Sequence, residues 1–233
     1  MTTDLLTEIA RAGPEHLDAA YVAAYDQKAG FDPGPDLEAL SARGLGEDST
    51  LIDFGAGTGT LAVDAASICK RMIAVDVSPA MVDAIRPKAD EASAQNVECV
   101  QAGFLSYEHQ GEAPDFIYMR NALHHLPDFW KGIALNRIAA LLAPGGTLQL
   151  RDLVFSFDLS DVRAGVERWL QSSAADRPED GWTRAELELH LRDEYSTFTW
   201  LLEPMLRRAG FKIESGDYGS VGVYASYICV KSG

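Results

Sequence analysis

The sequence predicts an α/β protein with a doubly wound, mostly parallel seven-stranded sheet, an antiparallel C-terminal strand and a helical lid. Three observations support this prediction. Short apolar runs alternate with helical patterns after residue 50, a glycine-rich turn follows the first run, and residues 211–230 contain two alternating apolar and polar segments. Alternation with short connections is typical of right-handed crossovers, which place helices on both faces of a sheet.

The elements follow from these patterns in chain order. We expect N-terminal helices over residues 5–11, 15–28 and 36–43. Strands are expected at 51–54, 72–76, 97–101, 115–119 and 147–153, with helices at 60–70, 79–93 and 129–142. The rhythm then breaks into an insertion with helices at 161–172 and 183–193, the second opening on a capping-box pattern. A helix ending at residue 210 and a strand pair complete the chain.

The most informative motif combines two acids with alternating glycines. Asp53 ends the first predicted strand, Gly55, Gly57 and Gly59 form the turn after it, and Asp76 ends the second strand. The glycines remove Cβ atoms from the rim of the turn, so a ligand can approach the backbone closely. An acid after the second strand is placed to accept hydrogen bonds from ribose hydroxyls. The motif therefore predicts a nucleoside-cofactor site.

The spacing of the motif indicates which cofactor is bound. A dinucleotide site places its third glycine three residues after the second, whereas Thr60 occupies that position here. The carboxylate of Asp53 suits a cationic amine better than a pyrophosphate, because like charges repel in a partly dry cleft. These features favour S-adenosylmethionine over NAD. The segment resembles the first motif of class I S-adenosylmethionine-dependent methyltransferases, which are Rossmann-like, and the looser resemblance extends to about residue 230.

The resemblance implies further cofactor contacts near the ends of the second, third and fourth strands. Members of the family often carry an acid after the third strand that reaches the adenine amine, but this chain has glycine there, which leaves recognition to backbone groups. Two of the candidates, a methionine and a phenylalanine, are alternatively core residues. The candidate contacts are Val77, Met81, Gly103, Phe104 and Asn121.

Two adjacent histidines, His124 and His125, follow the fourth predicted strand and are the candidate catalytic residues. Neutral imidazole can accept a proton from an acceptor hydroxyl or amine as the methyl group arrives. Adjacent side chains of an extended segment cannot both point into one cleft, so at most one is expected to be catalytic. The alternative for each histidine is a local packing or capping role.

Composition excludes several classes of partner. The formal net charge of −15 disfavours DNA or RNA as a substrate. Three separated cysteines predict neither a disulfide framework nor a zinc site, and no His, Asp and Glu spacing predicts a metal. The chain has no apolar run near the length of a membrane span, and residues 1–10 carry Asp4 and Glu8 instead of the basic start and apolar core of a leader. We therefore expect no membrane contact and a cytoplasmic location.

We expect a single methyltransferase domain over residues 1–233. It comprises an N-terminal helical cap (1–48), a cofactor-binding core (49–153), a lid insertion (154–198) and a C-terminal helix with a strand pair (199–233). The predicted function is methyl transfer from S-adenosylmethionine to an O, N or C atom of a small-molecule acceptor, with S-adenosylhomocysteine as the product. The alternative is an S-adenosylmethionine-binding protein without methyl transfer, acting as a sensor or partner subunit. A homodimer is left open.

Overall fold

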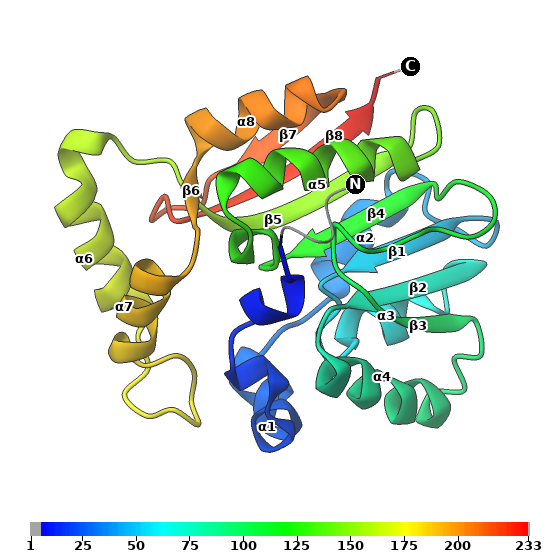
Figure 1. Cartoon of the computed structure of the whole chain (residues 1–233), viewed down its shortest axis with the longest axis horizontal. Coiled ribbons are helices and arrows are strands. Elements are labelled where there is room, and N and C mark those ends of the chain that lie inside the picture. Colours follow the sequence, from blue (N-terminus) through cyan, green and yellow to red (C-terminus); the bar gives the residue numbers. More distant parts are fainter. Residues whose placement is uncertain (1–5, 233) are drawn as a thin grey trace.

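The computed structural model describes residues 6–232 and contains an eight-stranded sheet (Figure 1). The strands run in the order β3-β2-β1-β4-β5-β8-β7, and the short β6 pairs with β5 beside this path. Their bounds are Thr50–Phe54 (β1), Arg71–Asp76 (β2), Val97–Gln101 (β3), Phe116–Arg120 (β4), Thr147–Phe155 (β5), Thr197–Phe198 (β6), Phe211–Asp217 (β7) and Tyr224–Lys231 (β8). Strands β1 to β5 are parallel, and β8 is antiparallel to both its neighbours. The predicted seven-stranded arrangement is confirmed, with β6 as an unpredicted addition.

Helices cover both faces of the sheet. One apolar cluster joins the sheet to α5 (Asp128–Leu141) and α8 (Thr199–Arg208), and another joins its other face to α2 (Gly34–Ser41), α3 (Thr60–Ala65) and α4 (Pro79–Glu91). Side chains alternate along a strand, so Ile52 of β1 belongs to the first cluster and Leu51 to the second. Helix α3 ends at Ala65, well before the predicted end at residue 70.

The N-terminal segment is less helical than predicted. Residue 5 of the expected helix 5–11 lies outside the described residues, and the remainder forms a 3₁₀ turn, η1 (Glu8–Arg11). The prediction of one helix over 15–28 was wrong at its start, because a second turn, η2 (Glu15–Leu17), precedes α1 (Ala19–Ala29). Asp18 accepts hydrogen bonds from the backbone N–H groups of Ala20 and Tyr21, and this cap begins the helix anew.

The lid contains α6 (Val162–Ser173) and α7 (Arg184–Asp193), preceded by the turn η4 (Leu159–Asp161). Thr183 and Glu186 form the predicted capping box at the start of α7. Buried Trp169 and Leu187 join the lid to the end of β5 in a third apolar cluster. Figure 1 shows α6, α7 and α1 beyond the carboxyl ends of the parallel strands, the edge at which such sheets bind ligands.

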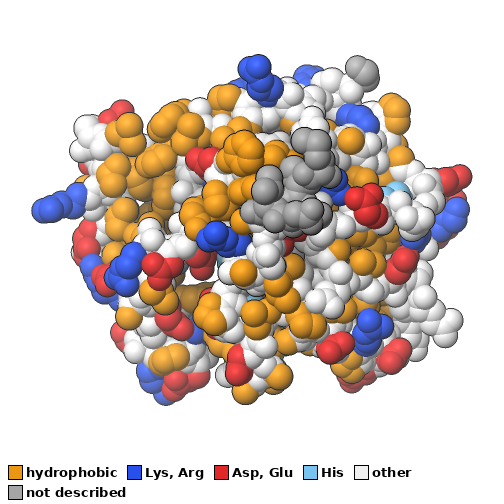
Figure 2. Space-filling view, in the orientation of Figure 1, with side chains coloured by type: hydrophobic (Ala, Val, Ile, Leu, Met, Phe, Trp, Pro, Cys, Tyr) orange, Lys and Arg blue, Asp and Glu red, His pale blue; other side chains and the backbone are white. Residues whose placement is uncertain are grey.

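Charge is dispersed over the visible face of the molecule. Figure 2 shows Lys and Arg side chains interspersed with Asp and Glu among the described residues, and apolar side chains gathered near α6 and the adjoining end of α8. Leu159 in η4, just before α6, and Trp200 near the start of α8 are exposed apolar side chains. Across residues 6–232, no helix combines the length and apolar character needed to cross a membrane.

Candidate active site

The turn between β1 and α3 brings backbone to the edge of a cavity. Gly55 and Gly57 have φ angles of +73° and +55°, the left-handed region that favours glycine. A Cβ on Gly55 would lie 2.3 Å from Cβ of Ala122, whereas the nearest atom to a Cβ on Gly57 would be Cε1 of Tyr25 at 3.9 Å. Gly57 therefore faces open space and both cavities described below. Gly59 lines neither, because its missing Cβ makes room for Ile85 of α4.

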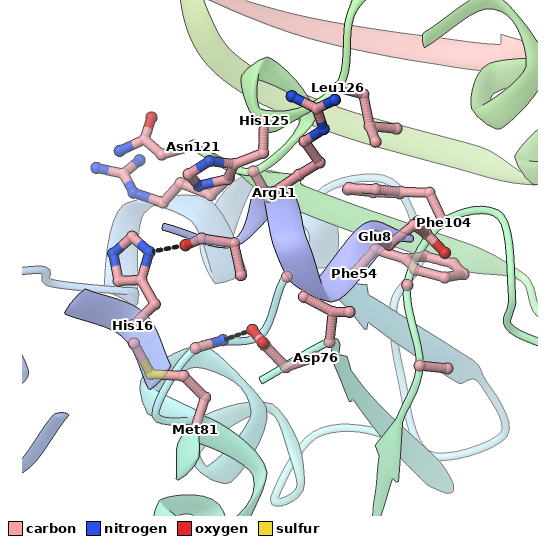
Figure 3. A pocket seen from close by; sticks show the side chains of 18 of the residues that line it. Glu8, Arg11, His16, Phe54, Asp76, Met81, Phe104, Asn121, His125 and Leu126 are labelled. Carbon is pink, nitrogen blue, oxygen red and sulfur yellow. Dashed lines mark hydrogen bonds between the residues drawn. The ribbon is translucent and has the colours of Figure 1, made fainter. Parts of the chain in front are cut away.

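Asp76 at the end of β2 fixes this turn and also lines the cavity. Its Oδ2 accepts a hydrogen bond from the N–H of Gly57 at 2.8 Å (Figure 3). Its Oδ1 accepts one from the N–H of Ser78 at 2.8 Å. Burial raises the pKa of Asp76, although both hydrogen bonds act against that rise. Each carboxylate oxygen has a second lone-pair site, so the side chain can still accept hydrogen bonds from a ligand.

Two adjoining cavities lie at the carboxyl edge of the sheet. The first has a volume of about 100 Å³ and the second of about 240 Å³. The predicted residues Val77, Met81, Gly103 and Phe104 line the first cavity, and Asp53 lines the second. The walls shared by both are Tyr25, Gly55, Gly57, Arg120 and Asn121.

Met81 and Phe104 serve the core as well as the cavity wall. Both are at most 9% exposed, and the ring of Phe104 stacks on that of Phe54 with centroids 5.6 Å apart. Asn121 holds a left-handed backbone with φ of +48°, and its Oδ1 accepts a hydrogen bond from Nη1 of Arg151 at 2.7 Å. The two alternatives considered for Met81 and Phe104, core and contact surface, are thus compatible with each other.

The carboxyl group of Asp53 is only 3% exposed in the second cavity. Burial, followed by the nearby carboxylates of Asp76 and Asp36, raises the pKa of Asp53 to about 8. A cation beside it would restore the ionised form, since an opposite charge within a few ångströms favours the charged state. The second cavity therefore suits a cationic group of a ligand.

The two histidines differ in position. His125 lines the first cavity, whereas His124 lines neither and is buried. Nδ1 of His124 lies 2.5 Å from Oδ1 of Asp152, and its Nε2 lies 2.9 Å from Oε2 of Glu194. Burial by itself would lower the pKa of His124, but Asp152 and Glu194 outweigh it and raise the pKa to about 9. His124 is thus a positive charge held between two acids.

His125 has the opposite ionisation. Burial first, and then the positive charge of His124, lowers the pKa of His125 to about 3, so its ring is neutral near pH 7. Its buried Nδ1 has no hydrogen-bond partner among residues 6–232 and lies 3.8 Å from Oε2 of Glu194. His124 is therefore charged and held by two acids of the protein, whereas His125 is neutral and lies on the cavity wall.

His124, His125 and Glu194 bring ligand atoms within 4.8 Å of one another, a spacing that a metal ion could use. The sequence did not predict this group, because Glu194 belongs to the distant lid. Glu194 already contacts the charged His124 at 2.9 Å and Nδ1 of His190 at 2.7 Å. We therefore interpret the group as a network that fastens the lid to the core.

Sequence reasoning missed the N-terminal part of the cavity. Four residues of the segment from η1 to η2 line it: Glu8, Arg11, Ala12 and His16. Figure 3 shows the segment crossing the cavity opposite Asp76. The ring of His16 meets that of His125 edge to face, with centroids 5.6 Å apart. No motif marks these contacts, because they depend on how the segment folds back over the sheet.

The residues present fit S-adenosylmethionine. Asp76 retains acceptor sites for ribose hydroxyls, Phe54 and Phe104 offer an apolar wall for a purine, and Asp53 suits a cation in the adjoining cavity. The rim at Gly57 is open to close approach.

Comparison with known proteins supports the same conclusion. Residues 51–146 match the family model described as a methyltransferase domain. The chain is 30% identical over 130 residues to the methyltransferase str2 of Strobilurus tenacellus, covering 54% of this chain and 44% of that protein. It is 26% identical over 165 residues to an uncharacterized methyltransferase of Bacillus licheniformis, covering 66% and 76% of the two chains. The chain thus spans less than half the length of the first relative.

A solved structure shows the same fold. A phosphoethanolamine N-methyltransferase 2 of Haemonchus contortus, in complex with phosphomonomethylethanolamine and S-adenosylhomocysteine, superposes with a TM-score of 0.71 at 16% identity, over 99% of this chain and 61% of that one. Residues 51–146 thus form a methyltransferase domain, the chain as a whole has the methyltransferase fold, and these findings support S-adenosylmethionine as the cofactor.

Proposed function

We propose that the protein transfers a methyl group to an O, N or C atom of a small-molecule acceptor. Bound S-adenosylmethionine supplies the methyl group as a sulfonium substituent. The observation that carries the proposal is that Asp76, which suits the ribose, and the neutral His125 line the same cavity. A candidate acceptor group beside His125 would therefore lie close to the cofactor.

The residues of the cleft would act mainly by orientation. Asp76 and the Gly57 turn hold the ribose end, while Asp53 and Arg120 flank the methionine end. Fixing two reactants in line is worth up to roughly 7–11 kcal/mol of the barrier. The lid and N-terminal segment would limit the access of water to this cleft.

His125 would accept a hydrogen bond from the acceptor. The carboxylate of Glu194, 3.8 Å from Nδ1, favours the proton on that nitrogen and leaves the lone pair on Nε2. A pKa of about 3 makes this nitrogen a weak base, so its main contribution would be to orient the acceptor. We expect no pH dependence from His125 between pH 5 and 8.

Several observations support a small acceptor. The net charge of −15 opposes a nucleic-acid substrate, and the candidate site is a cavity lined in part by the N-terminal segment, beside a second cavity that Trp182 lines. The structurally similar Haemonchus contortus enzyme is in complex with phosphomonomethylethanolamine, a small molecule.

The test is a comparison of His125→Ala with His109→Ala, whose ring lies outside the cavity. Turnover would be measured with isotopically labelled S-adenosylmethionine and a panel of small phenols, amines and carbon acids. His125→Ala is expected to slow methyl transfer about 100-fold because the acceptor is no longer held in line, while the affinity for S-adenosylhomocysteine measured by calorimetry stays near wild type.

Loss of cofactor affinity in His125→Ala would place this histidine in the cofactor site and contradict its role toward the acceptor. Tight cofactor binding with no methyl transfer to any member of a broad panel would favour a binding protein that acts as a sensor or partner subunit.

A further inference from the structure

The first cavity carries a second carboxylate besides Asp76. Glu8 of η1 lines the cavity together with Phe54 and Phe104 (Figure 3). Its Oε1 accepts a hydrogen bond from the N–H of Leu105 at 3.0 Å, and its Oε2 accepts one from Oγ of Ser106 at 2.9 Å. These contacts fasten the N-terminal segment to the loop after β3, a part of the chain nearly a hundred residues away.

Gly103 provides the space that Glu8 occupies. A Cβ built on Gly103 would lie 2.4 Å from Cδ and 2.4 Å from Oε1 of Glu8. Gly103 is not among the glycines with positive φ, so its backbone does not require glycine. The reason for a small residue here is the carboxylate that enters from the N-terminal segment.

The chemistry of the two hydrogen bonds leaves Glu8 able to bind a ligand. A carboxylate offers about four lone-pair sites, of which Leu105 and Ser106 use two. The neighbouring wall is aromatic, with Phe54 and Phe104 stacked at 5.6 Å between ring centroids. An acceptor of hydrogen bonds at the edge of an aromatic surface suits an exocyclic amine on a flat heterocycle.

We propose that Glu8 forms the subsite for the amine of the cofactor's adenine, and that Gly103 is small in order to admit it. The inference rests on the assignment of this cavity to the adenosine half of S-adenosylmethionine. A specificity-determining acid is then supplied by the N-terminal segment, at the place where the chain after β3 has a glycine. Cofactor binding consequently holds this segment in place over the cleft.

Calorimetric titration with two ligands tests the subsite. S-Adenosylhomocysteine presents an amine, and S-inosylhomocysteine presents a carbonyl oxygen at the same ring position. The wild-type protein is expected to bind the adenine compound about 10- to 100-fold more tightly, because a carboxylate accepts from the amine and repels the carbonyl. In Glu8→Ala, the affinity for the adenine compound falls by a similar factor and the discrimination is lost.

Three further variants sharpen the test. Glu8→Gln can donate to the carbonyl, so its preference is expected to shift toward the inosine compound. Glu8→Ala combined with Gly103→Asp returns an acid from the loop itself and is expected to recover most of the discrimination. Glu15→Ala, an acid of the same N-terminal segment that does not line the cavity, serves as the matched control and is expected to behave as wild type.

Equal affinity of the wild-type protein for both compounds, or tighter binding of S-adenosylhomocysteine by Glu8→Ala, would overturn the subsite. The second outcome would identify the carboxylate as an obstruction of the cavity. Failure of the wild-type protein to bind either compound would instead overturn the cofactor assignment on which the subsite depends. Thermal unfolding of each variant distinguishes these results from loss of the fold.

Discussion

Two aspartates at the same edge of the sheet behave in opposite ways. Asp76 ends β2 and receives hydrogen bonds from Gly57 and Ser78, one on each oxygen. Asp152 lies within β5 and receives four, two on each oxygen: from the N–H groups of Leu123, His124 and Leu153, and from the ring of His124. Asp76 therefore keeps acceptor sites for a ligand, whereas the protein itself uses those of Asp152. Residue type and strand position alone do not distinguish a binding carboxylate from a structural one.

The largest expected effect comes from Asp152→Asn. Removing one partner of a buried ion pair costs on the order of 3 kcal/mol, so we expect the free energy of unfolding measured in urea to fall by about that amount. Because Asp152 does not line the described cavities, the affinity for S-adenosylhomocysteine is expected to stay within a few-fold of wild type. A folded variant of wild-type stability would show that the carboxylate has no structural role.

The ion pair between His124 and Asp152 predicts a pH dependence of stability. The pKa of His124 is raised to about 9 from an ordinary value of about 6.5, so its contribution is complete below pH 6.5 and is lost as the pH rises toward 9. The pKa of Asp152 is lowered, so its contribution is lost only in acid, below about pH 4. Urea unfolding of the wild type at pH 6.5 and 9 is expected to show the decline, and Asp152→Asn is expected to flatten it. An unchanged slope in the variant would contradict the pairing.

Asp76→Ala is expected to lose cofactor affinity and to keep most of its stability, the reverse of Asp152→Asn. Hydrogen bonds to a charged group are worth about 1.5–3 kcal/mol each, so calorimetry is expected to find at least a 10- to 100-fold loss of affinity for S-adenosylmethionine. Its stability is expected to change less than that of Asp152→Asn, because burial already raises the pKa of Asp76 and disfavours its charge. Asp83→Ala on the exposed surface of α4 is the control. Normal cofactor affinity in Asp76→Ala would remove the basis of the site.

The smallest effect is expected from a pair between the cap and the lid. Nζ of Lys28 in α1 lies 2.5 Å from Oε1 of Glu186 in α7, and its charge also lies over the ring of Trp182. Lys28→Met keeps the apolar stem and is expected to lower the free energy of unfolding by about 0.5–1 kcal/mol, a difference that 1 M salt diminishes. A loss that persists in high salt would show that packing, not charge, joins α1 to the lid.

Local patterns were sufficient to predict the sheet and to place the residues proposed for the cofactor at one edge of it. Asp53, Gly57 and Asp76 lie within one strand-turn-helix-strand unit, so their positions follow from short-range geometry. The N-terminal helices were predicted less well, because the cap at Asp18 interrupts an otherwise helical pattern. Gly59 was assigned to the cofactor site, but the structure uses it to pack α4 against the turn.

The acceptor half of the site could not be predicted in this way. Nothing in the adjacent pair His124-His125 distinguishes one ring from the other, and the difference arises from Asp152 and Glu194, which other parts of the chain supply. Glu8 and Gly103 likewise carry no joint signal in the sequence, although a Cβ on Gly103 would lie only 2.4 Å from the carboxyl group of Glu8.

The sequence by itself determined where the parallel strands lie along the chain, the glycine turn after β1 and the acid that ends β2, because each depends on neighbours along the chain. Only the tertiary structure decided which histidine faces the cavity, which aspartate the protein uses for itself, and which acid approaches Gly103. These roles depend on burial and on charges that long-range folding brings together, and those two quantities set the ionisation and the hydrogen-bonding capacity of a side chain.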